Sequence, residues 1–109
     1  MTQRGQFVTV ALSGDYGKPR PALVIQNSLF AEHPSVVVCL LTTMIQSGMD
    51  HFRIEVAPTP ENGLRQKSQV SIDKIATVPI AKIGAAIGYA DEELLLQVNR
   101  ALAVWLSLA

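Results

Sequence analysis

The sequence predicts a mainly β fold, a small β-barrel with a C-terminal helix, and three observations point to it. Short runs of apolar and β-branched residues are separated by clusters of glycine, proline, serine and asparagine, as in strands joined by turns. A single helical pattern follows these runs near the end of the chain. At 109 residues the chain has the length of one domain, so we expect residues 1–109 to form a single unit.

The first half of the chain predicts three strands. Residues 7–12 are rich in β-branched side chains, and the turn formers at 13–17 follow them directly. Residues 21–26 and 36–42 are continuous apolar runs, which is typical of strands that are buried on both faces. Between these two runs, residues 27–34 have room for one short helical turn.

The second half predicts shorter strands and a long loop. Residues 53–56 alternate between polar and apolar, which indicates a strand with one face in water. Residues 58–67 contain two prolines and a glycine and are expected to form a loop. The last strands are expected at residues 70–73 and 75–78.

The C-terminal segment has the pattern of an amphipathic helix that begins after Asp91. Aspartate is a good N-cap, and two glutamates follow in the first turn, where the helix dipole favours negative charge. Apolar residues then recur at helical spacing, namely Leu94, Val98, Leu102 and Trp105. Short strands followed by one such helix indicate a curled antiparallel sheet or barrel that the helix caps.

Composition excludes several classes of protein. Apolar residues make up 49% of the chain, which argues against disorder, and no apolar run approaches the ~20 residues that cross a bilayer. The first residues lack the apolar stretch of a signal peptide, so we expect a cytoplasmic protein. Cys39 is the single cysteine, which excludes an internal disulfide and a site of several cysteines. We expect it to be a small buried hydrophobic residue.

The charges balance overall but are unevenly distributed. The formal net charge is 0, which argues against a protein that holds nucleic acid by bulk electrostatic attraction. Residues 1–84 carry eight Lys or Arg against six Asp or Glu, a balance of +2, and residues 85–109 carry one against three, a balance of −2. A weakly positive body with an acidic C-terminal helix is compatible with a short nucleic-acid site.

Arg20 is the most informative candidate for a functional side chain. It lies between Pro19 and Pro21, directly before an apolar strand. Proline fixes its own φ and restricts the residue before it to extended conformations, so the backbone around Arg20 is stiff. A guanidinium mounted in this way is pre-organised to bind an anion such as phosphate. The alternative is an arginine that begins a strand and is only solvated.

A linear set of residues spans nearly the whole chain: Arg4 and Gly5, the run 20–27, Leu41 and Thr42, and the run 72–77 before the terminal helix. In this order and spacing the set resembles the MazF/PemK/Kid family of toxins from bacterial type II toxin–antitoxin pairs. The resemblance implies an SH3-like barrel of the CcdB/MazF/Kid type and a homodimer. It also implies a sequence-specific, metal-independent endoribonuclease (an mRNA interferase) that needs no cofactor, cuts single-stranded RNA and is blocked by a cognate antitoxin protein.

The resemblance also assigns roles to individual residues. The catalytic arginine and threonine of the family fall on Arg20 and Thr42. An asparagine after the second strand, which contacts a base in some members, matches Asn27. The family's RNA-contacting pair in the fifth-strand region, often an acidic residue followed by glutamine, falls on Asp73 and Lys74.

These residue types suit the cleavage of RNA without a metal, because the 2′-hydroxyl is an internal nucleophile beside its own phosphate. The guanidinium of Arg20 can stabilise the extra charge of the phosphorane, and the hydroxyl of Thr42 can donate one hydrogen bond to the same phosphate. Side chains nearby add further candidates: Asp15 as a general base or a ribose contact, Tyr16 as a stacking surface, and Lys18 and Arg53 as phosphate contacts.

Two other functions remain open at this point. A DNA gyrase-poisoning toxin resembling CcdB would share the barrel and helix but would have no nuclease activity, and local similarity at residues 76–84 and a tryptophan near the C-terminus favour it. Arg20 and Thr42 argue against it, because a protein that only binds does not need them. A non-catalytic SH3-like adaptor would display an aromatic groove for peptides, for which only six aromatic residues are available.

Overall fold

The computed structural model describes residues 2–12 and 18–108. Within these residues the chain forms six strands, two 3₁₀ turns and one α-helix. In chain order they are β1 (Gln6–Val10), β2 (Arg20–Val24), η1 (Ser28–Phe30), β3 (Ser35–Thr42), β4 (Arg53–Val56), β5 (Ser68–Pro79), η2 (Ile80–Lys82), β6 (Ile83–Tyr89) and α1 (Glu92–Trp105). The predicted mainly β fold with a C-terminal helix is confirmed.

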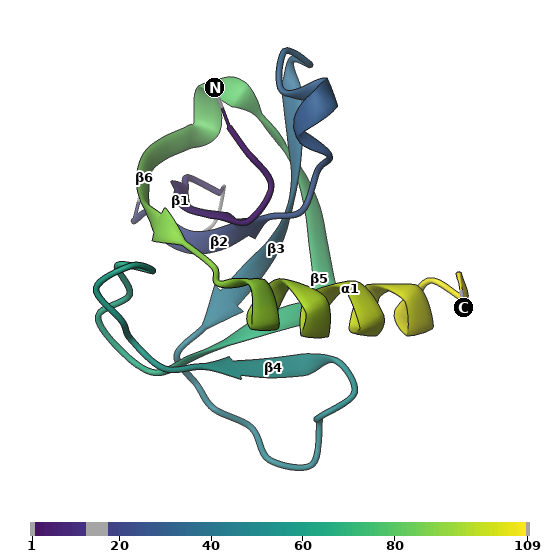
Figure 1. Ribbon diagram of the computed structural model, residues 1–109. Coiled ribbons are helices and arrows are strands. Elements are labelled where there is room, and N and C mark those ends of the chain that lie inside the picture. Colours follow the sequence, from purple (N-terminus) through teal and green to yellow (C-terminus); the bar gives the residue numbers. More distant parts are fainter. Residues whose placement is uncertain (1, 13–17, 109) are drawn as a thin grey trace.

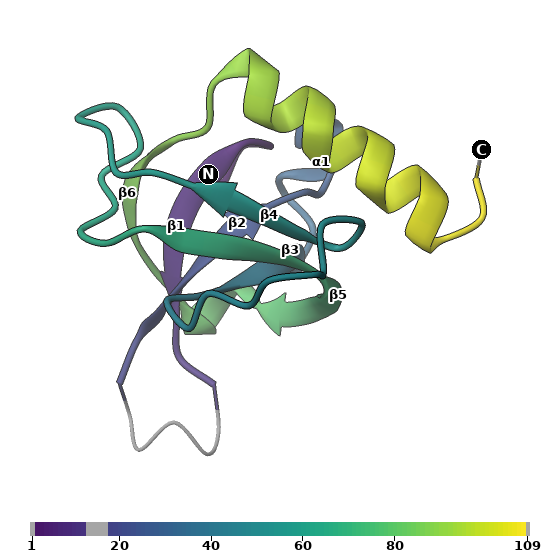
Figure 2. The ribbon, with the colours of Figure 1, turned by 90° about the horizontal axis from the view of Figure 1, so that it is seen from below.

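The strands form one antiparallel sheet in the order β4-β5-β3-β2-β1-β6. The sheet curls, so that the loop after β4 approaches β6 at the far edge (Figure 1). There the amide of Tyr89 donates to the carbonyl of Glu61 at 2.8 Å. The loop therefore connects the two edge strands and makes the sheet barrel-like. α1 packs across β4 and β5 (Figure 2).

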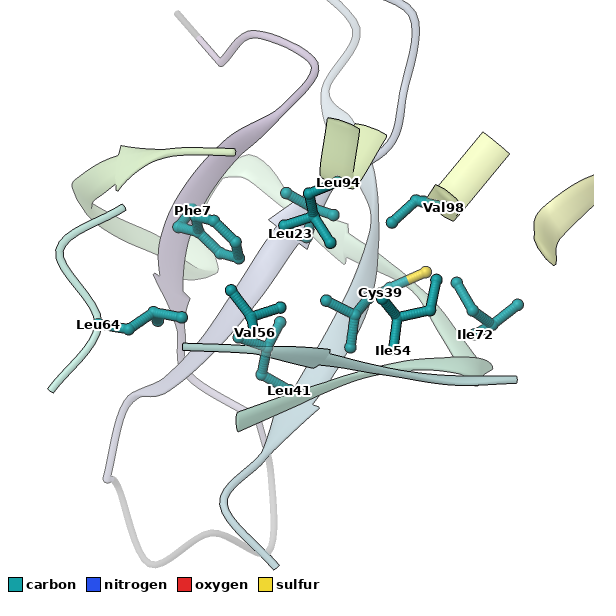
Figure 3. Close-up of a cluster of buried hydrophobic side chains, with 11 residues drawn as sticks. Phe7, Leu23, Cys39, Leu41, Ile54, Val56, Leu64, Ile72, Leu94 and Val98 are labelled. Atoms are coloured by element: carbon teal, nitrogen blue, oxygen red, sulfur yellow. The ribbon is translucent and has the colours of Figure 1, made fainter. Parts of the chain in front are cut away.

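β2 and β3 are buried on both faces, as their apolar runs predict. Leu23 and Cys39 enter the cluster that α1 covers, drawn in Figure 3, whereas Val24 and Val38 enter a second cluster. Cys39 is fully buried, and burial raises the pKa of its thiol to about 11, so its expected role as a small buried hydrophobic residue is confirmed. The two clusters hold both strands from both sides and fix the positions of their ends.

The prediction of separate strands at residues 70–73 and 75–78 is wrong, because both belong to β5. In the sequence, the polar residues Asp73 and Lys74 interrupt the apolar pattern and therefore suggest that one strand ends and another begins there. The backbone instead keeps its pairing with β3 on both sides of them and absorbs the interruption as a shift of register.

The sequence does not predict β6, because glycine and alanine have a low strand propensity and make up four of its seven residues. Close packing explains this composition. A Cβ atom added at Gly84 would overlap the side chain of Thr9 on β1, and one at Gly88 would overlap the backbone of Asn62 in the loop after β4. Small residues therefore allow β6 to lie against both neighbours.

α1 begins where the sequence predicts, since the Asp91 carboxylate accepts a hydrogen bond from the Leu94 amide at 2.8 Å. Burial then decreases along the predicted apolar stripe: Leu94 and Val98 are buried, Leu102 is half-buried and Trp105 is 48% exposed. The last turns project past the strands (Figure 2). No helix among the described residues is long and apolar enough to cross a membrane.

Candidate active site

Arg20 and Thr42 lie at the same end of the sheet, on neighbouring strands. β2 begins at Arg20 and β3 ends at Thr42, and the two strands pair antiparallel as far as Ala22 opposite Leu40. Extending this register by two residues would set Arg20 opposite Thr42. Residues directly opposite each other in antiparallel strands point to the same face, with Cβ atoms about 4.5–5.5 Å apart. The register thus brings the two predicted catalytic residues together.

Polar side chains continue this row across the next two strands. Thr42 is opposite Gln69 on β5, and Gln69 is opposite Glu55 on β4. We call Arg20, Thr42, Gln69 and Glu55 the polar row. Arg20 and Glu55 are exposed, Thr42 is half-buried, and Gln69 is buried. Four neighbouring strands therefore present hydrogen-bonding groups along one line.

The hydroxyl of Thr42 has a defined partner. Its Oγ1 accepts a hydrogen bond from the amide of Met44 at 3.1 Å. The side chain of the first residue of the turn thus stabilises the turn. A hydroxyl that accepts one bond still has a proton to donate. The turn therefore orients Oγ1 without using the donor that a phosphate oxygen would need.

Gln69 is a site residue that the sequence analysis missed. Its amide forms two hydrogen bonds with the backbone of Gln46, one from the Gln46 amide to Oε1 at 3.2 Å and one from Nε2 to the Gln46 carbonyl at 2.9 Å. Gln69 lies between the loop expected at residues 58–67 and the strand expected at 70–73, so neither expectation included it.

Among the described residues, Arg20 and Lys18 are two exposed cations that lie close together in the chain. Arg20 begins β2, where its backbone pairs with Val10 of β1, and the exposed Lys18 precedes it by two residues. Because proline stiffens the backbone at this end of β2, Lys18 is held close to Arg20 and so adds a second positive charge beside the polar row. The other candidates from this part of the sequence, Asp15 and Tyr16, lie outside the described residues.

Two of the predicted RNA contacts are partners of each other. Arg53 Nε donates to Asp73 Oδ1 at 2.8 Å and Arg53 Nη2 donates to Asp73 Oδ2 at 3.1 Å, a two-pronged ion pair between β4 and β5. The Arg53 side chain is 8% exposed. The hydrogen bond from Arg53 is the main cause that lowers the pKa of the Asp73 carboxyl. This geometry favours a structural role for the pair, and Lys74 beside it is exposed.

Asn27 is far from the polar row along β2. Arg20 begins this strand, whereas Asn27 follows its other end and caps η1, with Oδ1 accepting from the Leu29 amide at 2.9 Å. Within one copy of the chain, the structure therefore does not bring Asn27 next to Arg20.

A surface groove of about 840 Å³ adjoins the polar row at Gln69 and Glu55. It lies between the loop after β3 and α1, and its charged lining includes Arg53 and Arg100. Arg20 and Thr42 do not line it. The row therefore borders an open groove on its β4 side. Among the described residues, no three His, Cys, Asp or Glu side chains form a group that could hold a metal ion.

Comparison with known proteins gives consistent matches over most of the chain. Residues 3–106 match the family model described as "PemK-like, MazF-like toxin of type II toxin-antitoxin system". A Mycolicibacterium smegmatis protein named "Probable endoribonuclease MazF" is 39% identical over 108 residues, which cover 98% of each chain. Endoribonuclease EndoA of Bacillus subtilis is 26% identical over 113 residues, covering 99% of this chain and 97% of that protein.

Solved structures agree with these matches. A mycobacterial endoribonuclease in complex with its cognate antitoxin superposes with a TM-score of 0.79 at 25% identity, covering 100% of this chain and 98% of the other. The Mycobacterium tuberculosis toxin MazF-mt6 superposes with the same TM-score at 26% identity, covering 94% and 96%. None of these matches supports the alternative of a gyrase poison. The chain belongs to the PemK-like, MazF-like toxin family of type II toxin–antitoxin systems.

Proposed function

We propose that this MazF-like endoribonuclease toxin cuts single-stranded RNA at short sequences, without a metal, by means of Arg20 and Thr42. The observation that carries the proposal is the β2–β3 register, which aligns an exposed guanidinium with a hydroxyl at one end of the sheet. A cation with planar donors and a neutral donor on one face match the oxygens of a single phosphate.

The proposed reaction is an internal transfer. The 2′-hydroxyl gives its proton to water and its oxygen attacks the adjacent phosphorus, while the bond from phosphorus to the 5′-oxygen breaks. The products are a 2′,3′-cyclic phosphate and a 5′-hydroxyl, and Arg20 regains its donated proton from water. Arg20 stabilises the charge that develops on the phosphorane oxygens and supplies a proton to the departing 5′-oxygen. Thr42 positions the phosphate through a hydrogen bond. One charge-stabilising contact of this kind is worth about 3–4 kcal/mol in the transition state.

The remaining RNA contacts in the proposal differ in their support. Lys18 and Lys74 are exposed cations suited to flanking phosphates. Asn27 would contact a base only at a distance from the scissile bond, since it follows the opposite end of β2. Arg53 and Asp73 would reach RNA only if their mutual ion pair opened.

We also propose a homodimer that a cognate antitoxin binds and that acts in the cytoplasm. A related endoribonuclease has been solved with its antitoxin. Large apolar side chains are exposed on the last turn of α1 and beyond it, namely Val104, Trp105, Leu106 and Leu108. Exposed apolar side chains that lie together in this way are typical of a surface that another protein chain covers. Sedimentation of the purified chain should give twice the mass of one copy.

Incubation of purified protein with naked RNA tests the proposed activity. We expect cleavage in the presence of a chelator, with 2′,3′-cyclic phosphate and 5′-hydroxyl ends, and cleavage by Arg20→Ala that is slower by about 10²–10³-fold. Intact RNA together with inhibition of gyrase supercoiling would instead establish the CcdB-like function. Fragments that carry 5′-phosphates would overturn the internal-transfer mechanism.

A further inference from the structure

We propose that Gln69 is a positioning residue for Thr42, acting through the turn that follows β3. The inference rests on the proposed function, since it assigns to Gln69 the task of keeping the Thr42 hydroxyl in place for the phosphate. Gln69 is 4% exposed and lies directly opposite Thr42 in the β3–β5 pairing. It does not face the reacting phosphate in this account, because both ends of its amide are occupied by Gln46.

The Gln69 side chain holds Gln46 as a neighbouring strand would. Its oxygen accepts from the Gln46 amide at 3.2 Å and its nitrogen donates to the Gln46 carbonyl at 2.9 Å. In an antiparallel sheet, a pair of residues exchanges the same two backbone bonds. The amide of Gln69 thereby extends the hydrogen bonding of the sheet to a segment that has left it. We call this contact the Gln69 clamp.

The Gln69 clamp and Thr42 hold the two ends of one short turn. Thr42 Oγ1 accepts from the Met44 amide at the start of the turn, and the clamp holds Gln46 at its end. The residues of the turn are exposed, and the side chain of Met44 is 75% exposed, so apolar burial contributes little to its order. Segments with few buried contacts open most easily. Polar contacts are therefore the main restraint on this turn.

Loss of the clamp has a specific consequence for the hydroxyl. When the turn opens, the Met44 amide moves away from Oγ1, and the rotamer of Thr42 is no longer fixed by its partner. Misplacement of a catalytic group by about 1 Å can remove its contribution to the rate, which for the Thr42 hydroxyl is about 10-fold. The expected loss is in kcat rather than in substrate binding, because Arg20 and the exposed lysines remain in place.

Gln69→Met tests the proposal, since it keeps an unbranched side chain of similar length and removes the amide. We expect kcat to fall by up to about 10-fold, the whole contribution of the Thr42 hydroxyl, with KM nearly unchanged, and amide hydrogen exchange at Met44 and Gln46 to become faster. Ser71→Ala is the matched control, because Ser71 is equally buried on β5 and its hydroxyl has no hydrogen-bond partner. It should change neither quantity.

A double-mutant cycle with Thr42→Ala separates positioning from a general loss of structure. If Gln69 acts through Thr42, then Gln69→Met lowers kcat in the wild-type background and has no further effect in Thr42→Ala. An equal loss in both backgrounds would overturn the proposal, as would faster exchange with an unchanged kcat. Wild-type activity of Thr42→Ala would overturn both the role of Thr42 and the proposal. Inactive Arg20→Ala beside a fully active Gln69→Met would defeat the proposal alone.

Discussion

The two ends of β2 are both associated with an arginine, and the fold uses them differently. At one end, Arg4 Nε donates to the Ile25 carbonyl at 2.9 Å and Arg4 Nη2 donates to Asn99 Oδ1 at 2.7 Å, so that the guanidinium joins the N-terminal segment, β2 and α1. At the other end, Arg20 is exposed in line with the hydroxyl of Thr42. The same functional group thus serves the fold at one end and, in our proposal, the chemistry at the other.

This contrast indicates that residue type alone does not decide which arginine is the catalytic candidate. Arg53 is a second example of an arginine in a structural contact. It lies on β4 beside the polar row and forms an ion pair with Asp73. Substitutions at the two ends of β2 should therefore affect different quantities, activity at the Arg20 end and stability at the Arg4 end.

Arg20→Ala should have the largest effect. We expect kcat to fall by about 10²–10³-fold, which corresponds to about 3–4 kcal/mol of transition-state stabilisation, while Tm stays close to the wild-type value because the side chain is exposed. Arg20→Lys should also lose most activity, since an ammonium cannot reproduce the planar set of donors. Calorimetry and single-turnover cleavage check both statements. A variant that unfolds, or that remains fully active, would contradict them.

Arg4→Ala should show the reverse pattern. Removing its charged donors leaves the Ile25 carbonyl and Asn99 without these bonds, at a cost of about 2 kcal/mol, or about 10 °C in Tm. Below its Tm the variant should cleave RNA with nearly wild-type kcat. Arg65→Ala, an exposed arginine in the loop after β4, is the control and should change stability by less than about 0.5 kcal/mol. Equal stability of Arg4→Ala and Arg65→Ala would contradict the structural role that we assign to Arg4 in contrast to Arg20.

Thr42→Val should have a smaller effect on activity than Arg20→Ala. Valine has the same shape but no hydroxyl, so we expect a loss of about 10-fold in kcat, the size of one neutral hydrogen bond. Thr42→Ser should restore most of the rate. Thr43→Val is the matched control, because Thr43 is the exposed neighbour. Equal losses in Thr42→Val and Thr43→Val would show that the hydroxyl of Thr42 has no special role.

Asp73→Asn should have the smallest effect, and its effect should depend on pH. The ion pair with Arg53 lowers the pKa of Asp73 below its ordinary value of 3.8. The charge therefore stabilises the folded state fully above that value, and the contribution is lost as pH falls through the lower folded-state pKa. At pH 7 the variant should be less stable by about 1 kcal/mol, and the two unfolding curves should converge below about pH 4. A constant difference at all pH values would contradict this.

Much of the fold follows from local patterns. The continuous apolar runs of β2 and β3 predict burial on both faces, and Asp91 with its two glutamates predicts the start of α1. These patterns did not predict the full length of β5 or the presence of β6, and each failure has a physical reason. In β5 a polar pair is tolerated by a shift of register, and in β6 the small residues are required by close neighbours, so neither segment has the alternation of an ordinary strand.

Less of the candidate site than of the fold could be predicted from the sequence. Arg20 stands out because two prolines flank it, whereas Thr42 enters through family resemblance, and the register explains why the two belong together. Gln69 could not be found in this way, because the role we propose for it depends on its contact with the loop after β3. Likewise, Arg53 and Asp73 are twenty residues apart in sequence, and their pairing depends on how β4 and β5 align.

Replacement of one non-bridging oxygen of the scissile phosphate by sulfur tests most directly whether Arg20 contacts that phosphate. Sulfur is a poorer hydrogen-bond acceptor, so the wild-type protein should cleave one phosphorothioate diastereomer more slowly than the normal substrate. We expect this ratio of rates to fall toward one in Arg20→Ala, because the side chain that contacts the substituted oxygen is absent. The same ratio in the wild type and in Arg20→Ala would contradict the placement of Arg20 on the reacting phosphate.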